Sequence, residues 1–184
     1  MKARLRQLNV VLAVAIISCL VLHGLQGGFS MAGIADNLAS KHLARLLVTL
    51  IAAHAGISVY LGVDTARASR AKRGAYAGAN ARFWAARISG LAIVVLVLLH
   101  LHQFMFRGGG LFRLKEFDGV RLAESVLLVL SVALHVLLNA KPLAIKLGLG
   151  RPDARALDIV LALAVLLLVM AACFVVYYIR WSVI

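Results

Sequence analysis

The chain has 184 residues, of which 63% are hydrophobic and 15% are charged. A mean hydropathy of +0.96 leaves too few polar side chains to coat a soluble globule of this size, so we expect a membrane protein. The net charge of +13 would suit nucleic-acid binding if the basic residues formed one solvated face. They collect instead at the ends of apolar segments, and we therefore expect no nucleic-acid partner.

Five apolar segments each approach or exceed the roughly 20 residues that a helix needs to cross the hydrocarbon core. In chain order they cover residues 8–28, 43–63, 88–106, 122–140 and 157–179. None alternates with the period of two that is typical of a membrane β-strand. The sequence therefore predicts an all-α membrane protein with five transmembrane helices, forming a single domain over residues 1–184.

The first segment, residues 8–28, is longer than the roughly 7–15-residue core of a signal peptide, and no clear small-x-small cleavage site follows it. We expect it to be retained as a helix. Of the 20 Lys and Arg residues, thirteen fall on the same side of the membrane as the N-terminus and seven on the other. The positive-inside rule therefore predicts a cytoplasmic N-terminus and an external C-terminus, in a multi-pass protein of the cell inner membrane.

Each of the first four segments carries a histidine well inside the apolar run: His23, His54, His100 and His135. An imidazole buried in lipid costs free energy unless something binds it. A single one is often an ordinary packing residue, but four on four helices need a common explanation. The fifth segment has no histidine, so we expect a four-helix bundle with a peripheral fifth helix.

Depth sorts these histidines into two pairs. His54 and His135 lie eleven and thirteen residues into inward-running segments, roughly 16–20 Å below the outer surface at about 1.5 Å per residue. By the same arithmetic, His23 and His100 lie roughly 8–9 Å below that surface. Two level imidazoles on different helices can hold one haem iron from both sides. We therefore predict two b-type haems, an inner one between His54 and His135 and an outer one between His23 and the third segment.

On that third segment, His102 competes with His100 as the outer ligand. The two side chains are separated by about 200° around a helix, so both cannot face one haem. The spacing leaves the choice open. Five glycines beside the histidines either leave room for a macrocycle or let helices pack closely: Gly24, Gly27, Gly28, Gly56 and Gly90.

Other membrane functions meet specific objections. A zinc or di-iron site usually brings its ligands to one depth together with carboxylates, and a proton pump is expected to bury an acid within a span. Here Asp64, Glu124 and Asp158 all lie near segment ends. A haem-free transporter or assembly protein remains an alternative, and the absence of haem absorbance would identify it.

The third segment opens with Arg87-Ile88-Ser89-Gly90, followed after nine further residues by His100. This resembles the Arg-x-[Ser/Thr]-Gly segment leading to an axial histidine in the type B, dihaem cytochrome b subunit of succinate dehydrogenase and fumarate reductase. Leu134-His135-Val136 is similar to the haem histidine in the second half of that family. The resemblance spans all five segments and selects His100 over His102.

The resemblance implies a quinone-reactive membrane anchor for a flavoprotein and an iron–sulfur subunit on the cytoplasmic side. Electrons would pass between the iron–sulfur subunit and a membrane quinone, commonly menaquinone, through both haems. The chain alone would hold no complete dicarboxylate active site. The basic loops at residues 67–87 and 141–155 would dock these partners, or would serve only as topology signals. The cytochrome b anchor of another quinone-linked dehydrogenase is the closest alternative, and higher oligomers remain open.

The quinone site is not matched by the resemblance. Polar residues near the outer haem are the candidates for hydrogen bonding and proton exchange with a quinone: Asp36, His42, Arg45 and Glu124. Polar side chains collect at this level of any membrane protein, so each is also readable as an ordinary interfacial residue.

Overall fold

The computed structural model describes residues 2–32, 38–71, 77–106, 112–114, 117–148 and 154–183. Five of its elements are long helices and two are short strands. In chain order they are α1 (Lys2–Met31), α2 (Leu38–Ala71), α3 (Ala77–His102), β1 (Phe104–Phe106), β2 (Phe112–Leu114), α4 (Gly119–Lys146) and α5 (Ala154–Val183). All five helices are long and apolar enough to cross a membrane, which confirms the predicted all-α membrane class.

Large apolar side chains cover the outside of the helices. Leu91 and Leu168, for example, are 66% and 69% exposed. In the apolar stretch of each helix, only 6–11% of the described residues are buried inside the protein. Exposing this much apolar surface to water would cost about 25 cal/mol per Å², so lipid or a partner subunit must cover it. The protein is therefore a multi-pass membrane protein.

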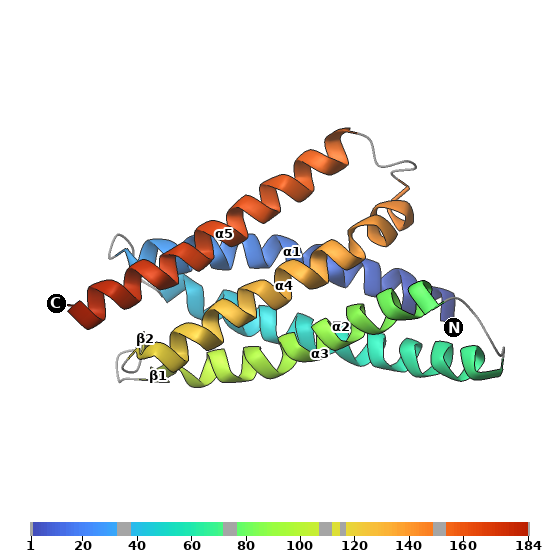
Figure 1. Cartoon of the computed structure of the whole chain (residues 1–184), viewed down its shortest axis with the longest axis horizontal. Coiled ribbons are helices and arrows are strands. Elements are labelled where there is room, and N and C mark those ends of the chain that lie inside the picture. Colours follow the sequence, from blue (N-terminus) through green and yellow to red (C-terminus); the bar gives the residue numbers. More distant parts are fainter. Residues whose placement is uncertain are drawn as a thin grey trace.

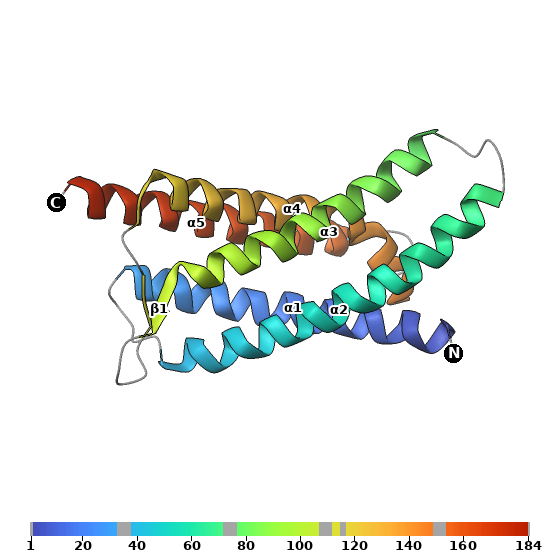
Figure 2. The same ribbon diagram turned by 90° about the horizontal axis from the view of Figure 1, so that it is seen from below.

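The helices run lengthwise in alternating directions (Figures 1 and 2). The end of α1, the start of α2 and the β1–β2 hairpin lie together at one end, which we call the hairpin end. The N-terminus, the end of α2 and the start of α3 lie at the other, which we call the N-terminal end. The closest helix pairs are α3 with α4, α1 with α2, and α4 with α5, and α5 also packs against α1.

A small core closes the contact between α4 and α5. Its buried members are Phe117, Val129, Leu167 and Phe174. The rings of Phe117 and Phe174 are stacked, with centroids 6.3 Å apart, and Tyr177 meets Phe117 edge-on at 5.4 Å. The fifth helix thus lies outside the four histidine-bearing helices but contributes two of the four buried core residues.

The predicted third helix, residues 88–106, is wrong at its C-terminal end, since α3 ends at His102 and β1 follows. The backbone N–H of Gln103 donates to the carbonyls of Leu99 and His100 at 3.2 and 3.1 Å, which closes the last turn. The chain then enters an antiparallel hairpin in which Phe104 pairs with Leu114. A short run of apolar residues fits a strand as well as a helix, which is why hydropathy alone extended the helix too far.

Pro142 lies inside α4, and this helix bends near its C-terminal end (Figure 1). Proline has no backbone N–H, so the carbonyl of Leu138, four residues earlier, loses its helical donor. The Arg82 side chain of α3 replaces that donor, because its Nη2 lies 2.9 Å from the Leu138 oxygen. The guanidinium thereby links α3 to α4 at the carbonyl that lacks its helical hydrogen bond.

Substitution of Arg82 by methionine is expected to lower the free energy of unfolding by about 1 kcal/mol, since the Leu138 carbonyl loses its donor. For a chain of this size that is about 2–4 °C in thermal unfolding in detergent. The Pro142→Ala variant restores a backbone N–H, so the same substitution in that background should cost close to nothing. An equal loss in both backgrounds would show that Arg82 does not act through this carbonyl.

Candidate functional site

His23 of α1 and His100 of α3 lie side by side. Their ring centroids are 6.4 Å apart and their planes are inclined at 83°. A metal–imidazole bond is about 2 Å long and the nitrogen lies about 1 Å from the ring centre, so two imidazoles on opposite sides of one metal have centroids about 6 Å apart. The observed centroid separation is close to this value, and the two rings meet edge to face.

The surroundings of this pair are apolar. The His100 ring meets the core residue Phe174 edge-on at a centroid distance of 6.4 Å. The Nδ1 atom of His23 is buried and has no hydrogen-bond partner among the described residues. A buried polar atom left in this state costs about 1–3 kcal/mol. A cost of this size is expected where a side chain is retained for its chemistry rather than its packing.

His135 of α4 packs against α3. Its Nδ1 lies 3.1 Å from the hydroxyl oxygen of Ser89, and a Cβ added to Gly90 would lie only 3.2 Å from its Cε1. The ring also interacts electrostatically with His54 of α2. The His135 ring is thus held against the Ser89–Gly90 segment of α3.

His54 lies sixteen residues from the start of α2 at Leu38, and His135 lies sixteen residues from the start of α4 at Gly119. At about 1.5 Å per residue, both are about 24 Å along their helices from the hairpin end. The Nδ1 atom of His54 is buried and has no hydrogen-bond partner within the described part of the chain. His54 thus shares with His23 a buried ring nitrogen that the protein leaves unsatisfied.

His102, the competing candidate on α3, is exposed at the last residue of that helix. Since His100 is the residue that lies against His23, the geometry favours His100 for the outer pair. The ring of His102 faces the surface of the bundle.

Three of the five glycines lie against a side chain of a neighbouring helix. Gly90 admits the edge of the His135 ring. Gly24 and Gly28 instead admit α5, because a Cβ at Gly24 would meet the Met170 sulfur at 2.5 Å and one at Gly28 would contact another α5 side chain. No such contact within 4 Å is found in the described structure at the remaining two, Gly27 and Gly56.

Glu124 is held in a buried polar network at the hairpin end. Gln103 Nε2 donates to its carboxylate at 3.0 Å, and Ser125 Oγ contacts the amide oxygen of Gln103 at 3.3 Å and the backbone oxygen of Arg121 at 2.8 Å. Gln103 is 2% exposed and Ser125 is fully buried. Arg121 Nη1 is also buried, and no described residue accepts a hydrogen bond from it. The network fixes the Glu124 carboxylate of α4 against Gln103, which directly follows α3 and lies three residues after His100.

The other quinone-site candidates are placed differently. His42 and Arg45 are exposed near the start of α2. Asp36 lies outside the described residues, as do most side chains of the basic loops at residues 67–87 and 141–155. The structure therefore does not bring the four candidates into one described cluster.

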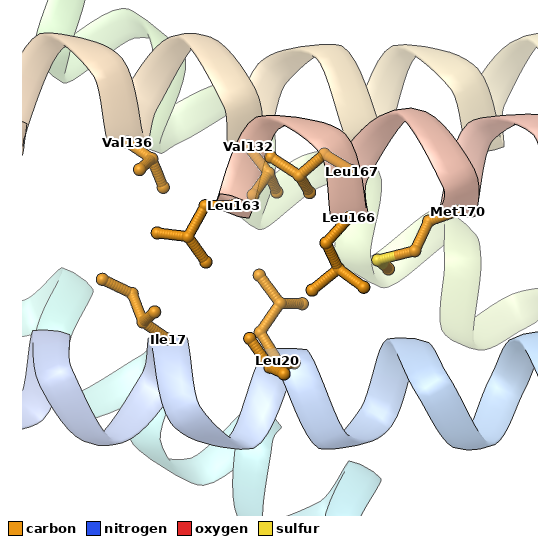
Figure 3. Close-up of a pocket in the computed structure, with 9 residues that line it drawn as sticks. Ile17, Leu20, Val132, Val136, Leu163, Leu166, Leu167 and Met170 are labelled. Atoms are coloured by element: carbon orange, nitrogen blue, oxygen red, sulfur yellow. The ribbon is translucent and has the colours of Figure 1, made fainter. Parts of the chain in front are cut away.

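A small cavity lies between α1, α4 and α5 (Figure 3). Its volume is about 20 Å³, and nine aliphatic or methionine side chains line it, including Leu20, Val132 and Met170. Apolar cavities of this kind stay dry. It is a packing gap far smaller than a macrocycle, and it is separate from the histidine pairs.

Within the described residues, no group of three or more His, Cys, Asp or Glu side chains could hold a metal ion. A haem held by two axial histidines would not form such a group. No protein-family model, no curated protein and no solved structure matches the chain. The function must therefore be argued from the histidines and their surroundings.

Proposed function

We propose that this chain is a dihaem cytochrome b, the quinone-reactive membrane-anchor subunit of a succinate dehydrogenase or fumarate reductase. The observation that carries the proposal is the placement of His23 and His100, whose separation of 6.4 Å suits one iron between them. The Arg87-Ile88-Ser89-Gly90 segment before His100 narrows the proposal to the succinate and fumarate enzymes by resemblance.

Four side chains would hold the two haems, each of which supplies a one-electron carrier when bound. His23 and His100 would bind the haem nearer the hairpin end, and His54 and His135 the haem nearer the N-terminal end. All four helices that carry these histidines run the length of the bundle. Two haems held at different levels along them would form a path for electrons across the membrane.

The soluble partners would dock at the N-terminal end, on the cytoplasmic side of the cell inner membrane. The described cations there include Arg82, Lys141 and Lys146. A basic surface attracts and orients an acidic partner over distances of about 10 Å at moderate ionic strength. This supports docking of the iron–sulfur subunit close to the His54–His135 level, with the flavoprotein subunit beyond it.

The quinone, proposed to be menaquinone, would react at the hairpin end. Glu124 is the candidate best placed for this, since Gln103 fixes its carboxylate near the end of the helix that carries His100. A carboxylate in this position can accept or release the proton that accompanies quinone reduction or quinol oxidation.

Replacing Glu124 by glutamine is expected to slow quinone turnover of the complete enzyme by about 100-fold, because the amide cannot exchange a proton. The amide oxygen can still accept from Gln103, so the haem content should stay unchanged. The matched control is Ser125→Ala, which removes a hydroxyl from the same network and leaves the carboxylate, and should keep turnover within a few-fold. Wild-type turnover in Glu124→Gln would exclude Glu124 from proton exchange.

The proposed function is tested by purifying the chain from its native membrane in mild detergent with its bound partners. A flavin-bearing subunit and an iron–sulfur subunit are expected to accompany it, and succinate should reduce haem in the purified complex. Co-purification of a hydrogenase or formate dehydrogenase with a haem-loaded chain would replace the proposal by a different quinone-linked enzyme.

A further inference from the structure

Ser89 sits at the contact between α3 and His135. Its side chain is 4% exposed, and its hydroxyl oxygen lies 3.1 Å from two atoms, the Nδ1 of His135 and the backbone oxygen of Ala86. The neighbouring Gly90 has no side chain to push the ring away. The hydroxyl is therefore fixed between a carbonyl on its own helix and an imidazole on α4.

The available protons determine the direction of these bonds. The single proton of the Ser89 hydroxyl is donated to the Ala86 carbonyl. In that arrangement the Ser89 oxygen offers its lone pairs to the ring, which suits a His135 tautomer with its proton on Nδ1.

We propose that Ser89 is a positioning residue that fixes the tautomer of His135, so that Nε2 carries the lone pair offered to the iron. The inference rests on the proposed function, because it assigns Ser89 a task only if His135 binds haem. The two ring nitrogens point in divergent directions, so a ring whose Nδ1 faces Ser89 turns its Nε2 away from α3. Ser89 thereby selects both the tautomer and the ring orientation.

His135 differs in this respect from His23, whose buried Nδ1 forms no hydrogen bond with a described residue. A hydrogen bond from the distal nitrogen raises the basicity of a ligating imidazole and stabilises the more oxidised metal. Ser89 should therefore lower the reduction potential of the haem that His135 would bind.

The test compares the wild-type complex with the Ser89→Ala variant by redox potentiometry and by electron paramagnetic resonance of the oxidised haems. Loss of a hydrogen bond to the non-ligating nitrogen of a histidine changes its metal affinity by about 10-fold or more. If the ligand binds the oxidised haem iron ten times more weakly and the reduced iron equally well, the one-electron reduction potential rises by about 59 mV. The shift is expected only in the haem that the His135→Ala variant lacks. Ser89→Thr retains a hydroxyl and should restore the potential and the resonance signal.

Ser18→Ala is the matched control, because the Ser18 hydroxyl also bonds a backbone carbonyl, that of Val14, and should leave both haems unchanged. If Ser89→Ala does not reach the membrane, Ser89→Cys takes its place, since it keeps the size but weakens the hydrogen bond. Unchanged potentials and resonance signals in a haem-loaded Ser89→Ala or Ser89→Cys protein would overturn the inference and leave the proposed function standing. A wild-type preparation without haem would overturn both.

Discussion

Replacing His100 by alanine is expected to remove one of two haems and leave the other in place. His100 and His23 lie at the ring separation that suits one iron, and a haem held by the remaining imidazole alone loses one of its two bonds to the protein. The measurement is haem content per chain together with the reduced-minus-oxidised spectrum, which should fall to about half of the wild-type amplitude. His23→Ala should give the same spectrum, because both variants open the same site.

His102→Ala is the matched control, since His102 is two residues away on the same helix and is exposed. It should retain both haems. If His102→Ala lost a haem and His100→Ala kept two, the choice of ligand on α3 would be reversed.

Replacing His135 by alanine is expected to remove the other haem and to block electron transfer between the iron–sulfur subunit and quinone. Loss of a ligand should cost more than the roughly 10–100-fold typical of a supporting hydrogen bond, so succinate:quinone activity should fall by more than about 100-fold. Succinate oxidation by the soluble subunits with an artificial acceptor should continue, which separates a broken electron path from a broken complex.

The control for this variant is Leu134→Ala, which changes the neighbouring side chain on α4, an exposed one, and should preserve both haems and activity. His54→Ala should match His135→Ala, and the double variant should be no worse than either single one, because both residues serve one site. Loss of the same haem in His135→Ala and His100→Ala would contradict the assignment of the four histidines to two separate haem sites.

The helices could be predicted from the sequence because lipid requires long uninterrupted apolar runs, and all five are present in the structure. The end of α3 could not be predicted in the same way. Phe104, Met105 and Phe106 are as apolar as the helix before them, and the strand that they form depends on pairing with Phe112–Leu114. Hydropathy contains no information about such a partner.

The sequence indicated which histidines to consider as ligands, but not the side chains that contact them. The cost of burying imidazole singled out His23 and His100, and the rise per residue brought them to similar depth. The same arithmetic says nothing of helix rotation. It could not show that Ser89 meets His135 or that Gly24 faces Met170 of α5, since both are contacts between helices distant in sequence.

The most direct test of the account is the haem content of the purified wild-type chain. Extraction in mild detergent, followed by a reduced-minus-oxidised spectrum and haem quantification, should show b-type haem at about two per chain. A correctly inserted, folded chain that carries no haem would contradict the account, since the buried histidines would then need another explanation.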